Sequence, residues 1–323
     1  MAENYQPSLF GEDSVAEAPD KSSSQPAEIW EQDTAKHALD ELFTLTYQYK
    51  TSKSYHELMK FVARFRFYSP FNAMLVHVQM PGARFVAPPH RWFNDFGRRI
   101  RVDAKPLVIL QPMGPVMFVF DVSDTNPTED SRPLPKSVEN PFEVRKGKIG
   151  NGLTLLIDNA KRDGLRITES QQGSQSAGSI CRASNDSKGS QKFQRGVDKD
   201  RNPVYVDIPV RYDMVTNEKL SQEARYATIV HELAHLYCGH LGTPNDKWWP
   251  NRRGLNHDRC EVEAESVTYL VCSRQNIDNP SEQYLSEFVS RNDEMPSISL
   301  ECVMKAAGLI ETMSLERMKL RKP

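Results

Sequence analysis

Two histidines four residues apart, with a glutamate beside the first, are the residues of this chain best suited to chemistry. Residues 231–235 read His-Glu-Leu-Ala-His. Residues i and i+4 lie on one face of an α-helix, so the imidazoles of His231 and His235 can reach one metal ion. Glu232 is then the general base that takes a proton from the attacking water and passes it to the leaving amine. The pattern predicts a zinc site for peptide hydrolysis, with a chance match as the alternative.

A catalytic zinc usually has three protein ligands and one position for water, so a third ligand is needed. His240 follows His235 by five residues, whereas the metzincin signature places its third histidine six residues on, so His240 does not fit that role. His257 and Asp258, in a segment rich in Asn, Arg and Gly, stay open as ligands. Tyr237 is a candidate for stabilising an oxyanion and equally for packing in the core.

The better source of a third ligand is the acidic run at residues 261–265, Glu-Val-Glu-Ala-Glu. In a helix, Glu261 and Glu265 share one face. We predict that Glu261 is the third zinc ligand, and that Glu265 holds His231 or His235 through its other ring nitrogen, with the reverse order left open. Without the histidine motif, the same run would indicate a solvated acidic helix face.

These residues must be positioned by helices. Ser221 is a good N-cap and Gly239 a common helix end, which predicts a helix over 222–238 around the motif. Apolar spacing predicts further helices over 259–273 and 281–290, and from Ser299 onward. A strand is expected at 204–209, and the segment 169–189, rich in Ser, Gln and Gly, is expected to be a mobile loop.

The N-terminal half alternates between helical and β patterns. Helical spacing runs from residue 34 to 78, and Ser69 with Pro70 interrupts it before a helix over 71–78. Two short β-rich runs at 106–110 and 116–122, separated by a proline and glycine turn, predict a hairpin. Proline-rich residues then indicate a linker.

Composition and charge narrow the class of protein. The chain has 323 residues, 38% of them hydrophobic, with no apolar run long enough to span a bilayer and no export signal, so we expect a cytoplasmic protein without membrane partners. The cysteines are five in number and lack a CxxC pair, which favours reduced thiols. Residues 1–33 carry eight acidic side chains against Lys21 alone, and residues 34–125 carry twelve basic against seven acidic ones. A basic block suits nucleic acid, but ordinary surfaces match it.

Longer segments resemble a known family. HELAHLYCGH followed by EVEAE is similar to the ImmA/IrrE-type metallopeptidases and to the catalytic domain of ArdC-type antirestriction proteins. FRFYSPFNAMLVHVQMPGARFVA, the surroundings of Trp92 and Gly97, PLVILQP and FVFDVSDT resemble the single-stranded-DNA-binding domain of ArdC-type proteins, in the same order. The insertion around 169–200 and the Trp248-Trp249-Pro250 loop depart from the pattern, so substrate preference is not carried over.

This resemblance, together with the patterns above, implies an α+β fold of two domains. The first is a mixed α/β module similar to single-stranded-DNA-binding domains, and the second is a mostly helical, gluzincin-like metallopeptidase domain with a small sheet whose edge strand can align an extended peptide. The expected boundaries are a disordered acidic tail at 1–30, the DNA-binding-like domain at 31–127, a linker at 128–148, and the zinc metallopeptidase domain at 149–323.

DNA contact is expected from basic and aromatic residues of the first domain. The group Arg98, Arg99 and Arg101 is the best candidate for phosphates, and Trp92 for stacking on an unpaired base. Further candidates of the same two kinds are Arg64, Arg66, Arg84, Arg91, Phe67, Tyr68 and Phe71. Most aromatics in such a stretch belong to a core, and many surfaces carry similar charge.

The resulting hypothesis is a zinc-dependent metallopeptidase with a single-stranded-DNA-binding domain, acting on DNA-associated or regulatory proteins in a mobile-element or antirestriction context. The alternative is a non-proteolytic protein that binds single-stranded DNA and in which zinc is structural. A third reading makes the N-terminal module a protein-interaction domain. The expected partners are thus single-stranded DNA and a protein or peptide substrate.

Overall fold

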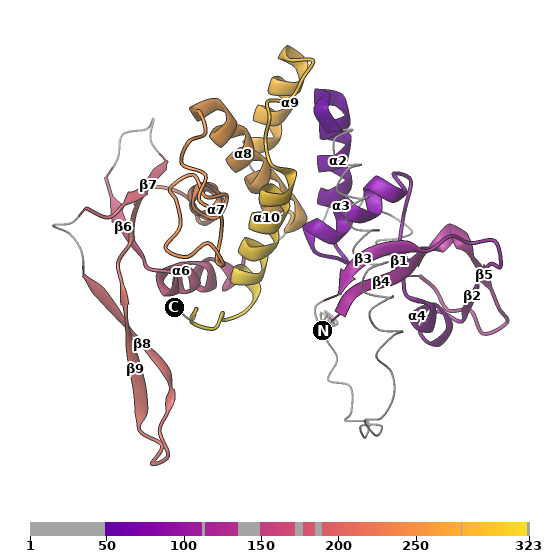
Figure 1. The fold of residues 1–323 in the computed structure, drawn as a ribbon, viewed down its shortest axis with the longest axis horizontal. Coiled ribbons are helices and arrows are strands. Elements are labelled where there is room, and N and C mark those ends of the chain that lie inside the picture. The colour runs from indigo at the N-terminus through magenta and orange to yellow at the C-terminus, as the bar shows by residue number, and fades with distance from the viewer. Residues whose placement is uncertain are drawn as a thin grey trace.

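The computed structural model describes residues 49–111, 114–134, 149–171, 177–184, 189–278 and 280–321. The predicted acidic tail at 1–30 lies outside these residues, as does most of the predicted linker at 128–148. The fold is α+β, as predicted, with a sheet-rich N-terminal part and a largely helical C-terminal part (Figure 1). Within the described residues, no helix combines the length and apolar character needed to cross a membrane.

The N-terminal part combines helices with two small sheets. Its elements are α2 (Ser52–Arg64), α3 (Pro70–Gln79), β1 (Val86–Ala87), α4 (Pro89–Asn94), β2 (Arg98–Ile100), β3 (Leu107–Gln111), β4 (Gly114–Asp121) and β5 (Thr125–Pro127). Strands β1, β4 and β3 form one sheet in that order, and β2 pairs with β5. The predicted hairpin is confirmed, since β3 and β4 pair in antiparallel fashion.

Helix α3 begins where the sequence predicts and also covers a strand edge. The Ser69 side chain accepts a hydrogen bond from the backbone of Asn72, and Pro70 occupies the first turn. Two turns apart on this helix, the amides of Asn72 and Gln79 each form a donor and acceptor pair with the backbone of β3, at Leu110 and Val108. These amides take the place of a neighbouring strand and block further pairing at this edge.

The C-terminal part holds the larger helices. Its elements are α6 (Gly152–Arg162), β6 (Leu165–Ser170), β7 (Gly178–Arg182), β8 (Ser190–Val197), β9 (Pro203–Pro209), β10 (Tyr212–Asn217), α7 (Gln222–Tyr237), α8 (His257–Arg274), α9 (Ser281–Arg291) and α10 (Leu300–Leu315). Strands β6, β10 and β7 form a sheet in that order. Among the described strands, β8 and β9 pair only with each other, and they project as a hairpin (Figure 1).

One expectation for this part is wrong. The segment 169–189 is not a continuous mobile loop, because β7 lies within it and pairs with β10 from Tyr212 to Thr216. Backbone pairing with β10 forms β7 from residues that are mostly small or polar and do not alternate between apolar and polar. The predicted helices around the motif are confirmed, since α7, α8 and α9 each begin and end within two residues of the expected bounds.

The two parts share one hydrophobic core. Buried residues of α2 and α3 belong to the same cluster as those of α7, α8 and α10. Helix α2 packs on α8 and α9, and α3 packs on α10, so the N-terminal helices stand against the C-terminal helices in Figure 1. The boundary at 128–148 stays a prediction for the chain, but apolar packing joins the elements on its two sides.

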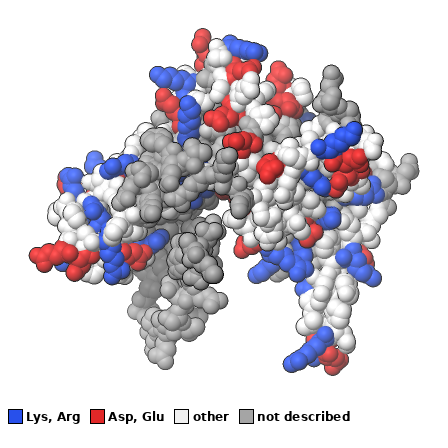
Figure 2. All heavy atoms as spheres, turned by 180° about the vertical axis from the view of Figure 1, so that it is seen from behind, with Lys and Arg blue, Asp and Glu red and all other residues white. Residues whose placement is uncertain are grey.

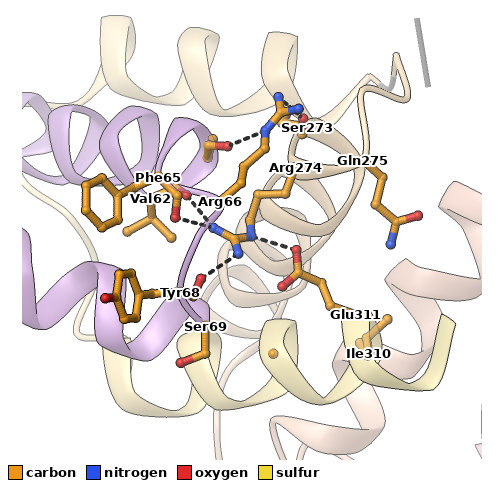
Figure 3. Close-up of polar contacts among 12 residues, drawn as sticks. Val62, Phe65, Arg66, Tyr68, Ser69, Ser273, Arg274, Gln275, Ile310 and Glu311 are labelled. Atoms are coloured by element: carbon orange, nitrogen blue, oxygen red, sulfur yellow. Dashed lines mark hydrogen bonds and ion pairs between the residues drawn. The ribbon is translucent and has the colours of Figure 1, made fainter. Parts of the chain in front are cut away.

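A buried arginine fixes this junction (Figure 3). The guanidinium of Arg274, on α8, donates hydrogen bonds to the carbonyls of Val62, Phe65 and Tyr68 at 2.8–3.0 Å, and to the Glu311 carboxylate of α10 at 2.6 Å. Carbonyls in the last turn of a helix have no partner within it, so Arg274 satisfies the end of α2 from another part of the chain. Burial raises the pKa of Glu311, and Arg274 opposes that rise.

Candidate metal centre

Helix α7 carries the motif and is anchored by its own sequence. Ser221 caps it by accepting a hydrogen bond from the backbone of Ala224. Ile229, Val230 and Leu233 are buried in the core, which turns His231 and His235 toward the helix α8 that packs alongside.

The predicted ligands converge. The Nε2 atoms of His231 and His235 lie 3.2 Å apart. Glu261, on α8, places one carboxylate oxygen 3.6 Å from His231 Nε2 and the other 3.4 Å from His235 Nε2. One ligand atom from each of the three lies within 4.8 Å of the other two. Two imidazole nitrogens and one carboxylate oxygen form a donor set that would suit a zinc ion.

Glu265 lies on the opposite side of the first histidine. Its carboxylate oxygen is 3.6 Å from His231 Nδ1, so it faces the ring nitrogen that Glu261 does not. The structure therefore brings Glu261 and Glu265 to the two sides of one imidazole, the arrangement that the sequence predicts for a ligand and its neighbour. His257 lies at the rim, exposed, with Nδ1 3.5 Å from Glu261. Asp258 stands in the first turn of α8.

Glu232 is buried beneath an edge strand. Burial raises the pKa of its carboxyl group; His231 opposes the rise, and Glu261 adds to it. Strand β7 lies directly over the helix here: a Cβ on Gly178 would stand 2.7 Å from Thr228 Cγ2 and 3.0 Å from the Val215 carbonyl. β7 is an outer strand of its sheet, so an extended backbone can pair with it beside Glu232.

The end of α7 positions a residue that sequence reasoning excluded. Gly239 adopts a left-handed conformation with φ of +83°, its N–H bonds the carbonyl of Leu236, and the N–H of His240 bonds the carbonyl of His235. This is a Schellman motif, which folds the residue after the glycine back onto the last turn. The imidazoles of His235 and His240 meet with their Nδ1 atoms 3.0 Å apart.

A buried ion pair lies behind His240. Its Nε2 is 2.9 Å from Glu263, whose carboxylate accepts two hydrogen bonds from Arg252 at 2.6 and 2.7 Å and one from the backbone of Ser299 at 2.7 Å. Burial alone would raise the pKa of Glu263, but these hydrogen bonds hold it below its usual value. Sequence reasoning assigned Glu263 only to an acidic face. The histidine after Gly239 was the signal that it missed.

Tyr237 was a candidate either for stabilising an oxyanion or for packing in the core. Tyr237 is buried and donates its hydroxyl to Asp163 at 3.0 Å, which Arg321 also contacts, so it packs away from the histidines and does not stabilise an oxyanion there. Tyr284, on α9, is a second tyrosine near the acidic residues of the site. Burial raises its pKa, and the negative charges of Glu265 and Glu261 add to the rise.

Trp92 corrects the expectation of base stacking. Its side chain is 0% exposed and its indole N–H donates to the Phe120 carbonyl at 2.9 Å. It packs against Phe85 and Phe96 in a small cluster of the N-terminal part. The short helix α4 has one apolar side to bury, and the largest side chain fills that space. Phe71 is likewise buried.

The predicted arginine group is divided between different environments. Arg98 is half-buried and donates to the side chain and carbonyl of Thr125. Arg101 is exposed and paired with Asp103. Arg99 is exposed, and among the described residues it makes no side-chain hydrogen bond or ion pair. Side chains alternate along β2, so Arg98 and Arg99 face opposite sides.

Two phenylalanines of the same part are exposed instead. Phe93, on α4, is 60% exposed, and Phe118, on β4, is 53% exposed. In the face shown in Figure 2, Lys and Arg of this part are interspersed with Asp and Glu. Exposed aromatic rings and basic side chains are the two components with which proteins bind unpaired bases.

The chain was compared with protein-family models, with curated proteins and with solved structures. No family model matches the chain, and no curated protein matches it. One solved structure, the metal-free crystal structure of the antirestriction ArdC protein from the R388 plasmid, matches with a TM-score of 0.32 and 10% sequence identity, over 80% of this chain and 94% of that chain. A likeness of this degree carries no argument about the site, which therefore stands on the residues themselves.

Proposed function

We propose that the chain is a zinc metallopeptidase in which His231, His235 and Glu261 hold the metal. The observation that supports this most is the convergence of two imidazole nitrogens and a carboxylate from neighbouring helices beside the buried Glu232. The five cysteines are free, which fits a cytoplasmic location.

The chemistry of the proposed reaction is divided among these residues. When bound, zinc would supply Lewis acidity at the site. Glu232 takes a proton from the attacking water and returns it to the leaving amine, and its raised pKa brings it closer to the working pH of a general base. The outer edge of β7 holds the peptide as an added strand. Based on the sequence resemblance, the substrate class is a DNA-associated or regulatory protein in an antirestriction context.

Metal content of purified variants tests this proposal. The wild type is expected to bind one zinc per chain. Glu261→Ala removes a ligand and is expected to lose most of the metal at limiting free zinc, because the site keeps only two protein ligands. Glu265→Ala removes a contact with His231 but no ligand, and is expected to weaken the affinity for zinc by about 10-fold to 100-fold. Equal loss in both variants, or none in Glu261→Ala, would contradict the assignment.

A second candidate function is binding of single-stranded DNA by the N-terminal part. The exposed rings of Phe93 and Phe118, with the exposed Arg99, favour it. In this alternative the zinc is structural and no peptide is cleaved.

Binding of an oligothymidylate at two salt concentrations tests this second function. Phe118→Ala is expected to weaken binding by about 1–3 kcal/mol through lost stacking. Arg99→Ala is expected to weaken it and to flatten its salt dependence, because one phosphate contact is lost. The matched control is Phe288→Ala, on α9, outside the N-terminal part. Wild-type binding no tighter than that of an unrelated protein of equal charge would exclude DNA as the partner.

A further inference from the structure

We propose that His240, Glu263 and Arg252 form a relay that positions His235 for metal binding. The inference rests on the proposed zinc site, and assigns to it three positioning residues that touch neither metal nor substrate. Each contact in the relay is direct: His235 Nδ1 to His240 Nδ1 at 3.0 Å, His240 Nε2 to Glu263 at 2.9 Å, and Glu263 to Arg252 at 2.6 and 2.7 Å.

The positions of the hydrogens follow from the partners. Glu263 accepts two hydrogen bonds from Arg252, so it is a carboxylate and an acceptor for His240. In its neutral form His240 then carries its hydrogen on Nε2 and presents a lone pair on Nδ1. A neutral His235 donates from Nδ1 to that lone pair, which leaves His235 Nε2 without a hydrogen. That atom is the one facing His231 and Glu261. The relay thereby selects the tautomer that binds zinc.

The backbone holds this relay in one geometry. The Schellman turn places His240 against His235, and the N–H of Arg252 bonds the Gly239 carbonyl at 2.9 Å, so the loop closes onto the helix end. A Cβ on Gly239 would stand 2.1 Å from the Pro250 carbonyl, so no other residue fits there. The His240 side chain is 4% exposed and that of Glu263 is 0% exposed, so water does not compete for these hydrogen bonds.

The same side chains have one competing interpretation. Cys238, His240 and Glu263 each offer an atom within 4.8 Å of the others, which is close enough for a second metal ion. Arg252 argues against it, because both Glu263 oxygens already accept from that guanidinium and a positive charge stands beside the place a cation would take. The relay leaves no donor or acceptor among these contacts without a partner, so the observations favour it.

Zinc affinity, measured by competition with a chromophoric chelator, tests the relay. His240→Phe removes the acceptor for His235 and is expected to weaken the affinity for zinc about 10-fold to 100-fold. His240→Gln offers an acceptor oxygen to His235 and a donor to Glu263, and is expected to recover most of the affinity. His90→Phe, at an exposed position of the N-terminal part, is the matched control and is expected to bind as wild type does.

The outcomes separate the relay from the zinc site itself. Wild type with one zinc and His240→Phe with unchanged affinity would overturn the relay alone. Two zinc ions per chain, one of them lost in Cys238→Ala, would replace the relay with a second metal site. A wild type that binds no zinc would overturn both the relay and the proposed function.

The imidazole ¹⁵N shifts of the metal-free wild type report which ring nitrogen carries hydrogen. This measurement does not depend on whether His240→Phe folds. We expect hydrogen on Nδ1 of His235 and on Nε2 of His240. The reverse arrangement at either ring would overturn the relay.

Discussion

Glutamine in place of Glu232 is expected to reduce metal-dependent peptide cleavage by roughly 10²-fold to 10⁴-fold, the usual contribution of a general base. The amide has nearly the shape of the carboxyl group but cannot accept a proton. Glu232 is not among the converging ligand atoms, so zinc content is expected to equal that of the wild type. Cleavage of a peptide library, followed by mass spectrometry with and without chelator, measures the first effect, and metal analysis measures the second.

The control for this variant lies on the same helix. Glu223→Gln changes an exposed glutamate in the first turn of α7 and is expected to cleave and bind zinc as wild type does. A Glu232→Gln protein that cleaves at the wild-type rate would remove Glu232 from the chemistry. Zinc-loaded wild type that cleaves no peptide would favour the non-proteolytic alternative.

Replacement of Arg274 by methionine is expected to lower the free energy of unfolding by about 3–5 kcal/mol. Methionine keeps much of the side-chain volume but leaves the carbonyls of Val62, Phe65 and Tyr68 without their donor and the largely buried Glu311 without its ion-pair partner. A typical domain is stable by only about 5–15 kcal/mol, so the loss is a large fraction of the whole. Urea unfolding followed by circular dichroism measures it.

Two further variants separate the contributions at Arg274. Adding Glu311→Gln to Arg274→Met removes the unpaired carboxylate and is expected to recover part of the loss, while the three carbonyls remain unsatisfied. Arg291→Met breaks an exposed ion pair with Glu287 on α9 and is expected to cost at most about 1 kcal/mol. Arg291→Met should have a free energy of unfolding within about 1 kcal/mol of the wild type. If Arg274→Met also falls within that limit, the junction does not depend on this arginine.

Local signals were enough to predict most of the helices. A cap and a terminating glycine define α7 on the sequence, and Ser69 with Pro70 defines the start of α3, because these effects act within one turn of the chain. The convergence of Glu261 with the histidines also follows from spacing, once two packed helices are assumed.

Other features depend on contacts distant in sequence. Strand β7 is ordered by pairing with β10, and its own residues carry no strand pattern. Trp92 is suited by type both to stacking and to a core, and only the neighbouring Phe85 and Phe96 decide between them. Arg274 reaches carbonyls more than 200 residues earlier in the chain, which no local pattern indicates.

The role of His240 lies between these cases. Comparison with a ligand spacing excluded it as a zinc ligand, and the structure keeps it off the converging group formed by His231, His235 and Glu261. Its contact with His235 was nevertheless encoded locally, by the glycine that ends the helix one residue earlier. A Schellman turn brings the residue directly after the glycine against the residue five positions before it, which here are His240 and His235.

The proposed function depends on one zinc ion bound between His231, His235 and Glu261. Crystals grown with zinc and measured on both sides of the zinc absorption edge test it most directly. We predict one anomalous difference peak per chain, within bonding distance of Nε2 of both histidines and of a Glu261 oxygen. A zinc-saturated protein without a peak at this place, or with its peak beside Cys238 and Glu263 instead, would exclude this zinc site.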